Sequence, residues 1–322
     1  MFRVKKYEEQ DKQLWNFFVQ TAKNGTFLFH RDFMDYHAHR FVDHSLLIFL
    51  DNKLLGVFVA NQNENKIYAH AGLTYGGLII QNELYTTFYF KIFRAVLNYY
   101  NENNFDEIYI KNIPAIFVKQ PADEIDYLAF ICEANLYRRD LHSTINYLND
   151  YRVSKSVLRD FKSVQNKFSF KESLDFDIFW NTLLVPNLQE VHQSLPVHSL
   201  NEIRYLKQNF SNQIKLFGCY LDQKLIGGVV IFETDTVAHC QYISGTKMFN
   251  KLHGLCFLLQ NVIAYYENKK AYFNFGISNV NYGKNINEGL LLWKEKFGAR
   301  AVSQSFYCFK TNSATKIDSI LV

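Results

Sequence analysis

A six-residue pattern occurs twice in this chain, about 170 residues apart. It reads Asp-x-Lys-Leu-(Leu or Ile)-Gly and spans residues 51–56 and 222–227. Each copy lies between two apolar runs, which is typical of a tight polar turn between two strands, closed by the glycine. A histidine follows each copy, as Ala69-His70 and Ala238-His239, and then come a helical pattern and an aromatic strand. This repeat is too long for a solenoid unit and predicts two similar domains that arose by duplication.

The bulk composition supports two domains of ordinary size. The chain has 322 residues, of which 48% are hydrophobic and 17% aromatic, so each half can bury a large core. We therefore expect an N-terminal domain over residues 1–150 and a C-terminal domain over residues 151–322. The formal net charge is +4, which favours an acidic small-molecule ligand such as a nucleotide over nucleic acid.

The cysteines and the hydropathy of the chain indicate in which cellular compartment it is expected. The five cysteines are scattered, odd in number and without a CxxC pair, so we expect buried thiols in a reducing compartment and no metal site. The N-terminus has no apolar signal region, and no run approaches the roughly 18 apolar residues that a membrane span needs. We expect a cytoplasmic protein without membrane insertion. Nothing in the sequence marks its oligomeric state.

Each half of the sequence predicts the same order of elements. This order is a strand, two helices, a meander of three strands, a helix, a strand, a helix and a final strand. In the first half we expect strands at 2–7, on both sides of the Asp51 turn, and at 67–75, 108–110 and 142–148, with helices at 9–23, 31–39, 84–99 and 123–135. A basic helix at 154–167 joins the halves, and the second half follows with helices at 176–184, 201–210, 252–266 and 288–297 and strands at 214–242, 272–277 and 301–309.

This order resembles that of the GNAT acyltransferase fold, and two copies in tandem resemble the FemABX branch of that superfamily, which builds peptidoglycan bridges from aminoacyl-tRNA. The most specific stretches are Phe273-Asn-Phe-Gly276, Asn287-Glu-Gly-Leu290 and Lys294-Glu-Lys-Phe-Gly298. The resemblance covers nearly the whole chain. It implies an α/β (α+β) class with two GNAT-like domains, each a mixed, mostly antiparallel sheet flanked by helices.

Two further stretches narrow the resemblance. Pro196-Val-His-Ser199 with Glu202, and Gly72-Leu-Thr-Tyr-Gly-Gly77, are similar to a subgroup found in bacterial surface-polysaccharide clusters. Its members transfer acyl groups, such as 3-hydroxybutanoyl, from acyl-CoA to the amine of dTDP-linked 3-amino-3,6-dideoxyhexoses. The resemblance implies an N-acyltransferase whose partners are acyl-CoA and a nucleotide-linked amino sugar. An aminoacyl-tRNA-dependent peptidyltransferase and a non-catalytic nucleotide-sugar binder remain alternatives.

The resemblance also implies where acyl-CoA binds. The splayed strand corresponds to 239–245, where backbone N–H groups near Ser244 and Gly245 would stabilise the oxyanion. The phosphate-side turn corresponds to 250–254, with Lys251, His253 and Gly254, and we also assign Asn274 to the cofactor site. The usual Q/R-x-x-G-x-G/A signature is absent there, and Gly254 has the alternative role of a packing glycine at a helix start. The matching turn of the first half, at 82–85, has an acid and no glycine, so we expect the cofactor only in the second domain.

Three residues are candidates for catalysis. An amino sugar is mostly protonated at neutral pH, so a base must take its proton, and His198 and His239 are placed for this role by the resemblance. Tyr75, in a segment with three glycines at 72–77, could orient the acceptor amine. The alternatives are a core role for His239, a capping box of Ser199 with Glu202, and close packing of the neighbouring domain against the glycines.

The acceptor side is expected in the first domain. Segment 29–44 contains four histidines, two arginines and three aspartates, of which Arg40 and Asp43, with Tyr36 beside them, would bind a nucleotide sugar. His70 could orient the amine. The spacing of the histidines does not favour a metal, and a buried ion-pair network that holds the loop is the main alternative. Lys294 completes the substrate-binding set as a contact to a ligand phosphate, or is a solvated helix lysine.

Overall fold

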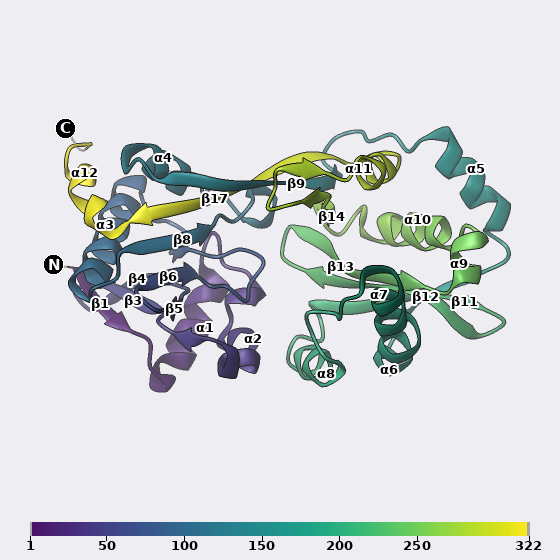
Figure 1. Ribbon diagram of the computed structural model, residues 1–322, viewed down its shortest axis with the longest axis horizontal. Coiled ribbons are helices and arrows are strands. Elements are labelled where there is room, and N and C mark those ends of the chain that lie inside the picture. Colours follow the sequence, from purple (N-terminus) through teal and green to yellow (C-terminus); the bar gives the residue numbers. More distant parts are fainter. Residues whose placement is uncertain (1, 321–322) are drawn as a thin grey trace. The chain divides into compact units, whose positions relative to one another are not determined.

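The computed structural model describes residues 2–320, and these form two compact units. Unit 1 contains the chain up to Asp140, Asn281–Lys284 and the chain from Ser303 onward. Unit 2 contains Leu141–Val280 and Asn285–Val302. In each unit, helices flank a mixed, mostly antiparallel set of strands (Figure 1). The predicted fold class is confirmed.

Unit 1 has two groups of paired strands. One has the order β1-β3-β4-β7, and the other runs from β17 through β8, β6 and β5 to β2. β6 pairs with β8 in parallel, whereas β3 pairs with β1 and β4 in antiparallel fashion. The strands are β1 (Phe2–Lys6), β2 (Val42–Asp43), β3 (Leu46–Leu50), β4 (Lys53–Phe58), β5 (Asn61–Asn63), β6 (Lys66–Ala69), β7 (Leu78–Ile80), β8 (Glu107–Lys111) and the end of β17 (Arg300–Lys310).

The core of unit 1 forms against the long helix α3 (Thr86–Glu102). Its residues Tyr89, Phe93, Val96 and Tyr100 recur at helical spacing and are at most 3% exposed. α3 lies with α4 and α12 on one side of the strands, and α1 and α2 lie on the other (Figure 1). The remaining helices are α1 (Lys12–Thr21), α2 (Arg31–Met34), α4 (Glu124–Ile131) and α12 (Ala314–Asp318).

Unit 2 is built on strands in the order β10-β11-β12-β13-β14-β9. α10 packs on one face, and α6, α7 and α8 lie on the other (Figure 1). The strands are β10 (Ser169–Ser173), β11 (Ile214–Leu221), β12 (Lys224–Glu233), β13 (Val237–Gly245), β14 (Tyr272–Ile277), the end of β9 (Asn135–Asn146) and the short pair β15 (Asn279–Val280) and β16 (Asn285–Ile286). The helices are α5 (Lys155–Val164), α6 (Phe176–Ile178), a π-helical segment (Phe179–Leu184), α7 (Val185–His192), α8 (Leu200–Asn209), α9 (Lys247–Lys251), α10 (Gly254–Tyr266) and α11 (Glu288–Glu295).

The repeated pattern forms a turn in both units, but the glycines have another role than predicted. The turns use left-handed residues, Asp51 with φ 54° and Asp222 with φ 47°. Gly56 and Gly227 lie inside the next strands, β4 and β12. A Cβ on Gly227 would lie 2.5 Å from the ring of Phe249, so this glycine makes room for an aromatic side chain.

Two elements of the first half were predicted with the wrong extent. The strand expected at 67–75 is interrupted, because β6 ends at Ala69 and β7 begins at Leu78. The helix expected at 123–135 ends at Ile131, and Asn135 already begins β9. In both cases hydrogen-bond partners far along the chain, not the local apolar pattern, decide where the strand begins or ends.

Strand pairing also corrects the match between the two histidines. Asn61 and Phe232 lie five residues beyond the repeated glycines, and they pair with Tyr68 and His239 respectively. His239 therefore corresponds to Tyr68, and not to His70. His70 instead begins the loop that interrupts the strand of unit 1.

The closing strand of each sequence copy is shared between the units. β9 follows α4 of the first copy, yet its residues from Leu141 onward belong to unit 2, where Asn146 pairs with Tyr272. β17 closes the second copy, yet its residues from Ser303 onward belong to unit 1, where Phe306 pairs with Lys111. The compact units therefore differ from a simple division of the chain at residue 150.

Candidate functional site

β13 and β14 of unit 2 run side by side only at their beginnings. They pair in parallel from Val237–His239 to Tyr272–Asn274 and then diverge. β13 stays on β12 as far as Gly245, while β14 continues along β9. A cavity of about 720 Å³ lies along the diverging part, and it is lined by Asn187, Cys240, Gln241, Ile243, Ser244, Gly245, Phe249, Asn250, Leu255, Phe275, Asn287, Gly289, Leu290, Trp293 and Lys294.

The open edge of β13 presents backbone groups to this cavity. Hydrogen-bonded and non-hydrogen-bonded positions alternate along an antiparallel pair. Thr246 N–H donates to Ile226 O at 2.8 Å, so the alternation directs the N–H and C=O groups of Gly245 and Ile243 away from β12. Both residues line the cavity. One wall is therefore a strand edge with backbone donors and acceptors.

A β-bulge lies in the middle of this edge. Val230 pairs with Tyr242 and Ile231 with Cys240, which leaves Gln241 as the extra residue. Gln241 lines the cavity. Without the bulge, Tyr242 would point to the same face as Cys240, because side chains alternate along a strand. The bulge turns Tyr242 to the opposite face.

Tyr242 meets one of the predicted catalytic residues there. Its hydroxyl oxygen lies 2.6 Å from His198 Nδ1 and accepts the backbone N–H of His198 at 3.2 Å. Trp180 donates its indole N–H to His198 O at 3.1 Å. Burial raises the pKa of Tyr242 to about 12. The tyrosine therefore stays protonated at neutral pH and fixes the position of the imidazole.

The end of the cavity toward α10 contains part of the predicted phosphate turn. Asn250 of α9 and Leu255, in the first turn of α10, line the cavity. The first N–H groups of a helix have no partner within it and form the positive end of its dipole. Gly254 is a packing residue, because a Cβ there would lie 2.3 Å from the ring of Phe249.

Two other residues predicted for the cofactor lie outside the cavity. Lys251 and His253 are exposed and are not among its lining residues. His253 Nδ1 lies 3.6 Å from Asp160 Oδ2. Ser244 does line it, and its hydroxyl donates to Leu183 O at 2.8 Å and accepts from Asn187 Nδ2 at 3.2 Å.

Lys294 is buried and lines the cavity; it is not the solvated helix lysine of the alternative interpretation. Its ammonium donates to Gly276 O at 3.1 Å and to Ile277 O at 2.6 Å. These carbonyls belong to an irregular stretch of β14, where the register against β9 shifts between Asn274 and Ile277. Burial lowers the pKa of Lys294 to about 8, so it is mostly charged at neutral pH.

Asn274 fixes the tautomer of His239. The backbone N–H of Gly276 donates to Asn274 Oδ1 at 2.9 Å, which identifies that atom as the acceptor. His239 Nδ1 lies 2.7 Å from the same oxygen and must donate its proton to it, so the lone pair is on Nε2. Burial lowers the pKa of His239 to about 4, which keeps the imidazole neutral at physiological pH.

His239 and Asn274 lie on the face of the strands away from α10. Their neighbours Ala238 and Phe273 belong to the core beneath α10, and side chains alternate between faces. His142 of β9 joins the cluster, with Nδ1 at 3.3 Å from Asn274 Oδ1. His142 has no mark in the local sequence pattern, because only strand pairing brings β9 beside β14. Neither His239 nor Asn274 lines the cavity.

In unit 1, Tyr75 and His70 are buried. Tyr75 is 1% exposed, and its hydroxyl donates to Thr26 Oγ1 over 3.4 Å. His70 is 3% exposed and its Nδ1 accepts the Gly72 N–H at 3.3 Å. Burial lowers the pKa of His70 to about 3. The roles predicted for these two residues with the acceptor amine stay predictions.

The predicted acceptor segment contains a buried ion-pair network. Arg31 is 4% exposed and donates to Asp43 at 2.9 Å and to Asp35 at 2.6 Å. The ion-pair interpretation therefore accounts for Asp43. Arg40 is exposed, with Nε 3.3 Å from His39 Nε2, and the ring of Tyr36 packs 4.2 Å from that of His37. Binding of a nucleotide sugar by these residues stays a prediction.

Unit 1 has the same divergence of strands but almost no space in it. β6 pairs with β8 in parallel and then leaves it, as β13 leaves β14. The cavity at this place has a volume of only about 10 Å³. The loop 70–77 occupies the position, with Gly76 N–H donating to Lys111 O at 2.9 Å. A cofactor site in the second half only stays a prediction.

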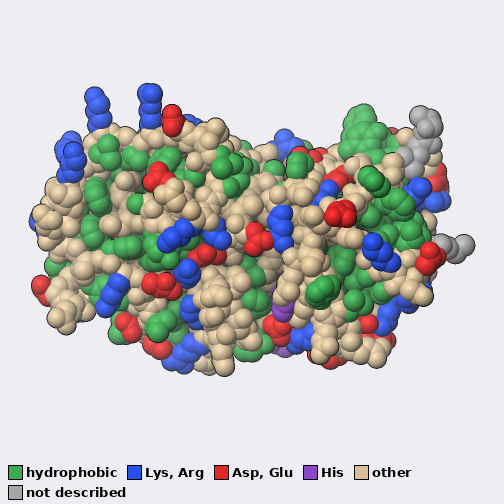
Figure 2. Space-filling view, turned by 180° about the vertical axis from the view of Figure 1, so that it is seen from behind, with side chains coloured by type: hydrophobic (Ala, Val, Ile, Leu, Met, Phe, Trp, Pro, Cys, Tyr) green, Lys and Arg blue, Asp and Glu red, His purple; other side chains and the backbone are tan. Residues whose placement is uncertain are grey.

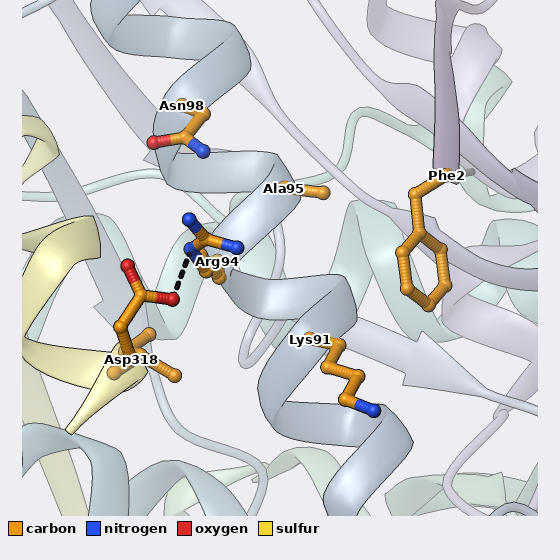
Figure 3. A pocket seen from close by; sticks show the side chains of 7 residues that line it. Phe2, Lys91, Arg94, Ala95, Asn98 and Asp318 are labelled. Carbon is orange, nitrogen blue, oxygen red and sulfur yellow. Dashed lines mark ion pairs between the residues drawn. The ribbon is translucent and has the colours of Figure 1, made fainter. Parts of the chain in front are cut away.

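A second cavity in unit 1, of about 350 Å³, lies beside α3 (Figure 3). Lys91, Arg94 and Asn98 project toward it from that helix, and Phe2 faces them from β1. Arg94 Nε is paired with Asp318 Oδ1 at 2.9 Å. None of its lining residues was predicted as a site residue.

Two further findings concern membranes and metals. Among the helices of residues 2–320, none has both the length and the apolar character to cross a bilayer. Within the same described part of the chain, no three His, Cys, Asp or Glu side chains converge as a metal site.

Comparison with known proteins finds solved structures with a similar fold. No family model and no curated protein matches the sequence. FemX has a TM-score of 0.65 at 9% identity, covering 94% of this chain and 96% of its own. L-PGS from Bacillus licheniformis has a TM-score of 0.56 at 9% identity, covering 87% of each chain. A tandem GNAT protein from the clavulanic acid biosynthesis pathway has a TM-score of 0.51 at 8% identity, covering 97% and 99%.

At these identities the likeness concerns the fold alone. It supports a tandem GNAT-like, FemABX-like fold over nearly the whole chain, as the order of elements predicted. A fold does not by itself determine a function, because one fold can carry many different sites.

Proposed function

We propose that this chain is an N-acyltransferase that binds acyl-CoA in the cavity of unit 2. The observation that carries the proposal is the divergence of β13 and β14, whose cavity of about 720 Å³ has a strand edge as one wall. The amides of a pantetheine arm can pair with the outward backbone groups of Ile243 and Gly245, as an added strand would. The volume is in the range of small-molecule sites.

The diphosphate of the donor would lie at the beginning of α10. Asn250 and Leu255 line the cavity there, and the N–H groups of a helix N-terminus favour an anion. Lys251 lies close in the chain and is our proposed additional cationic contact. The acyl group then extends toward Cys240 and Lys294.

In the proposed reaction, the acceptor amine attacks the thioester carbon and the C–S bond breaks. The amine loses a proton to a base, and the CoA thiolate takes up a proton. Backbone N–H groups of β13 are the proposed oxyanion donors. Hydrogen-bonded and outward-facing residues alternate along β13, so the N–H of Gly245 is favoured over that of Ser244, which faces β12. No covalent intermediate on the protein is needed, and burial raises the pKa of the Cys240 thiol.

We propose His239 as the base. Its imidazole is neutral at physiological pH and has its lone pair on Nε2, as a proton acceptor requires. Asn274 acts through His239 as a positioning residue. His198, held by Tyr242, is the alternative base.

The proposed acceptor is the amine of a dTDP-linked amino-deoxy sugar used in bacterial surface polysaccharide, and 3-hydroxybutanoyl is the proposed acyl group. This part rests on the resemblance carried by residues 196–199 and 72–77. Arg40 is exposed in segment 29–44, so it is our proposed contact to a nucleotide phosphate.

A second candidate is an aminoacyl-tRNA-dependent transferase, which the similarity to FemX favours. Binding of tRNA needs an extended basic surface. The net charge is only +4, and on the face shown in Figure 2 lysine and arginine side chains are interspersed with acidic ones. We therefore rank this candidate second.

The test is thiol release from acetyl-CoA and 3-hydroxybutanoyl-CoA, with and without dTDP-linked 3-amino-3,6-dideoxyhexoses. A blank without acceptor corrects for the five cysteines of the protein. We expect release that depends on the acceptor. Absence of release, with binding of the nucleotide sugar retained, would instead identify a binder without transferase activity.

A further inference from the structure

The charge on the side chains that line the cavity of unit 2 is of one sign, positive. Lys294 is the only charged side chain among the described residues that line it. The others are apolar side chains, glycines, a serine, a thiol and the amides of Asn187, Gln241, Asn250 and Asn287. Glu288 lies next to Asn287 in the chain, but it is exposed and not among the lining residues.

The ammonium of Lys294 is held in one place. Its two hydrogen bonds to Gly276 O and Ile277 O tie it to the irregular stretch of β14. An ammonium has three N–H donors, so one remains without a partner among the described residues. Lys294 is 4% exposed and lines the cavity, so a group bound there would meet this donor with little competition from bulk water.

Lys294 lies at the acyl end of the cavity. β13 runs from Cys240 to Gly245 and leads on to α9 and α10, whose beginning is the proposed phosphate end. Lys294 donates to Gly276 O, and a Cβ on Gly276 would lie 3.6 Å from the imidazole of His239, which precedes Cys240 at the opposite end of this edge. Phe275 and Trp293, with ring centroids 6.1 Å apart, form an apolar wall beside it.

We propose that this cavity selects acyl donors by the charge of the acyl chain: Lys294 binds a carboxylate at its end, neutral chains are accepted, and acyl groups with an ammonium are excluded. This inference rests on the proposed function and specifies its donor. A buried cation attracts a carboxylate through a charge-assisted hydrogen bond. The same cation repels an ammonium, and none of the described residues that line the cavity is acidic and could compensate. Aminoacyl donors belong to the excluded class.

The test compares the binding of four probes by isothermal titration calorimetry. CoA has no acyl group, butanoyl-CoA is neutral, β-alanyl-CoA has the same number of chain atoms with an ammonium at the end, and succinyl-CoA ends in a carboxylate. Relative to butanoyl-CoA, we expect succinyl-CoA to have an affinity higher by a factor of about 10 or more, and β-alanyl-CoA an affinity lower by a factor of about 10 or more. Equal affinities for the three acyl-CoA probes would overturn the inference.

The outcomes separate this inference from the proposed function. If CoA and butanoyl-CoA bind but charge has no effect, only the charge selection fails. If none of the four probes binds, the acyl-CoA proposal itself fails. If β-alanyl-CoA binds most tightly, the selection is opposite and the aminoacyl donor becomes the better candidate.

Variants assign the effect to one side chain. Lys294→Met should bring the affinities for the three acyl-CoA probes within about 3-fold of one another, and Lys294→Arg should keep their order. Lys224→Met, at an exposed lysine that begins β12, is the matched control and should leave the order unchanged. Retained selection in a folded Lys294→Met protein would overturn the assignment.

The wild-type protein offers a test without substitution. The groups around Lys294 are the Gly276 and Ile277 carbonyls, the Cys240 thiol and His239. Burial raises the pKa of Cys240 and lowers that of His239 to about 4, so neither changes charge between pH 7 and 9.5. The ratio of succinyl-CoA to butanoyl-CoA affinity should therefore fall as Lys294 deprotonates above about pH 8. A ratio that is constant over this range would contradict the role of Lys294.

Discussion

The two units have the same strand order around the place where two parallel strands diverge, yet the space differs from about 10 Å³ in unit 1 to about 720 Å³ in unit 2. Ile80 of β7 pairs with the repeated Gly56, and Gly245 of β13 pairs with the repeated Gly227, so Ile80 and Gly245 correspond to each other. Both residues direct their backbone groups away from the neighbouring strand. The difference lies in what meets these groups.

In unit 1, side chains and backbone of the segment after α1 cover this edge. Asn24 donates to Leu78 O at 2.9 Å and accepts from Ile80 N–H at 3.0 Å, and Lys23 N–H donates to Ile80 O at 3.1 Å. In unit 2, the corresponding groups of Ile243 and Gly245 face the cavity. A strand edge that is satisfied by its own chain cannot bind a ligand, whereas the uncovered copy is available for one.

Each gap also has one lysine that donates to two carbonyls. Lys111 of unit 1 binds Ala71 O at 2.8 Å and Leu73 O at 2.9 Å, and so holds the loop that fills the gap. Lys294 of unit 2 binds carbonyls of β14 and faces open space. Burial lowers the pKa of both lysines to about 8. The same kind of interaction holds the loop that fills the gap in unit 1, whereas in unit 2 it holds a lysine that lines the open cavity.

The largest expected effect comes from exchanging the corresponding residues His239 and Tyr68. If His239 is the base, His239→Tyr lowers acceptor-dependent thiol release by about 100-fold or more, because the proton acceptor is lost. Tyr68→His should leave the rate unchanged, because the cavity at the matching place of unit 1 has a volume of only about 10 Å³. The measurement is kcat/KM with a fixed acyl-CoA.

The pH profile checks the same assignment. A base must be deprotonated, so the contribution of His239 is lost only as the pH falls through its pKa of about 4. We expect no inflection from His239 between pH 5.5 and 8. Wild-type turnover in His239→Tyr and His239→Gln would refute its role and leave His198 as the candidate.

The next effect concerns the open cavity itself. Leu255→Trp should fill the space at the start of α10 and weaken acyl-CoA binding by about 10- to 100-fold, because the larger side chain occupies volume that the donor needs. Leu148→Trp, at a residue that is 72% exposed, is the control and should bind normally. Unchanged affinity in Leu255→Trp would show that the donor lies elsewhere.

A smaller effect distinguishes the covered edge from the open one. Asn24→Ala should lower the free energy of unfolding by about 1–3 kcal/mol, because Leu78 O and Ile80 N–H lose their partner in a buried place. It should not change acyl-CoA affinity. Asn187→Ala in unit 2 should have the reverse pattern, with weaker acyl-CoA binding and little change in stability, since Asn187 is only half-buried. Chemical denaturation and calorimetry measure both quantities, and identical patterns for the two variants would contradict the comparison.

The smallest effect is the pH dependence that the two lysines give to stability. Their folded pKa values, about 8, lie below the ordinary value of 10.5, so the unfolded chain binds more protons between these limits. Each lysine therefore makes the free energy of unfolding rise with pH in this window, by at most about 1.4 kcal/mol per pH unit.

Denaturation at pH 7.5 and 9.5 measures this contribution. The quantity compared is the free energy of unfolding of the wild type minus that of a variant. For Lys111→Met and for Lys294→Met it should become more positive as the pH rises, whereas for the exposed Lys224→Met it should stay constant. A difference that shrinks with pH would mean that the folded pKa values are raised.

Local patterns in the sequence predicted a large part of the fold. The capping box at the start of α8 was foreseen as an alternative role for Ser199 and Glu202, and each donates its backbone N–H to the side chain of the other, at 2.7 and 3.3 Å. Such a motif joins residues three positions apart, so the sequence alone contains both partners. The Asp51 and Asp222 turns were predicted for the same reason.

Apart from Ser244 and Lys294, the lining of the cavity was predicted mainly where it is made of backbone. The diverging strand at 239–245 follows from the order of elements, and its open edge needs no particular side chain. Asn24, His142, Gln241 and Tyr242 were missed, since each acts through a partner distant in the chain or through a strand register. A bulge at Gln241 has no mark in the local apolar pattern.

The duplicated pattern alone defines two copies of one strand and helix order, because turn residues and apolar periodicity are local properties of the chain. The tertiary structure decides that β9 and β17 are exchanged between the units, and that the loop 70–77 and Asn24 fill one gap while the other stays open. These outcomes depend on which backbone groups find partners across long sequence separations. The sequence lists the donors and acceptors, but only the folded chain pairs them.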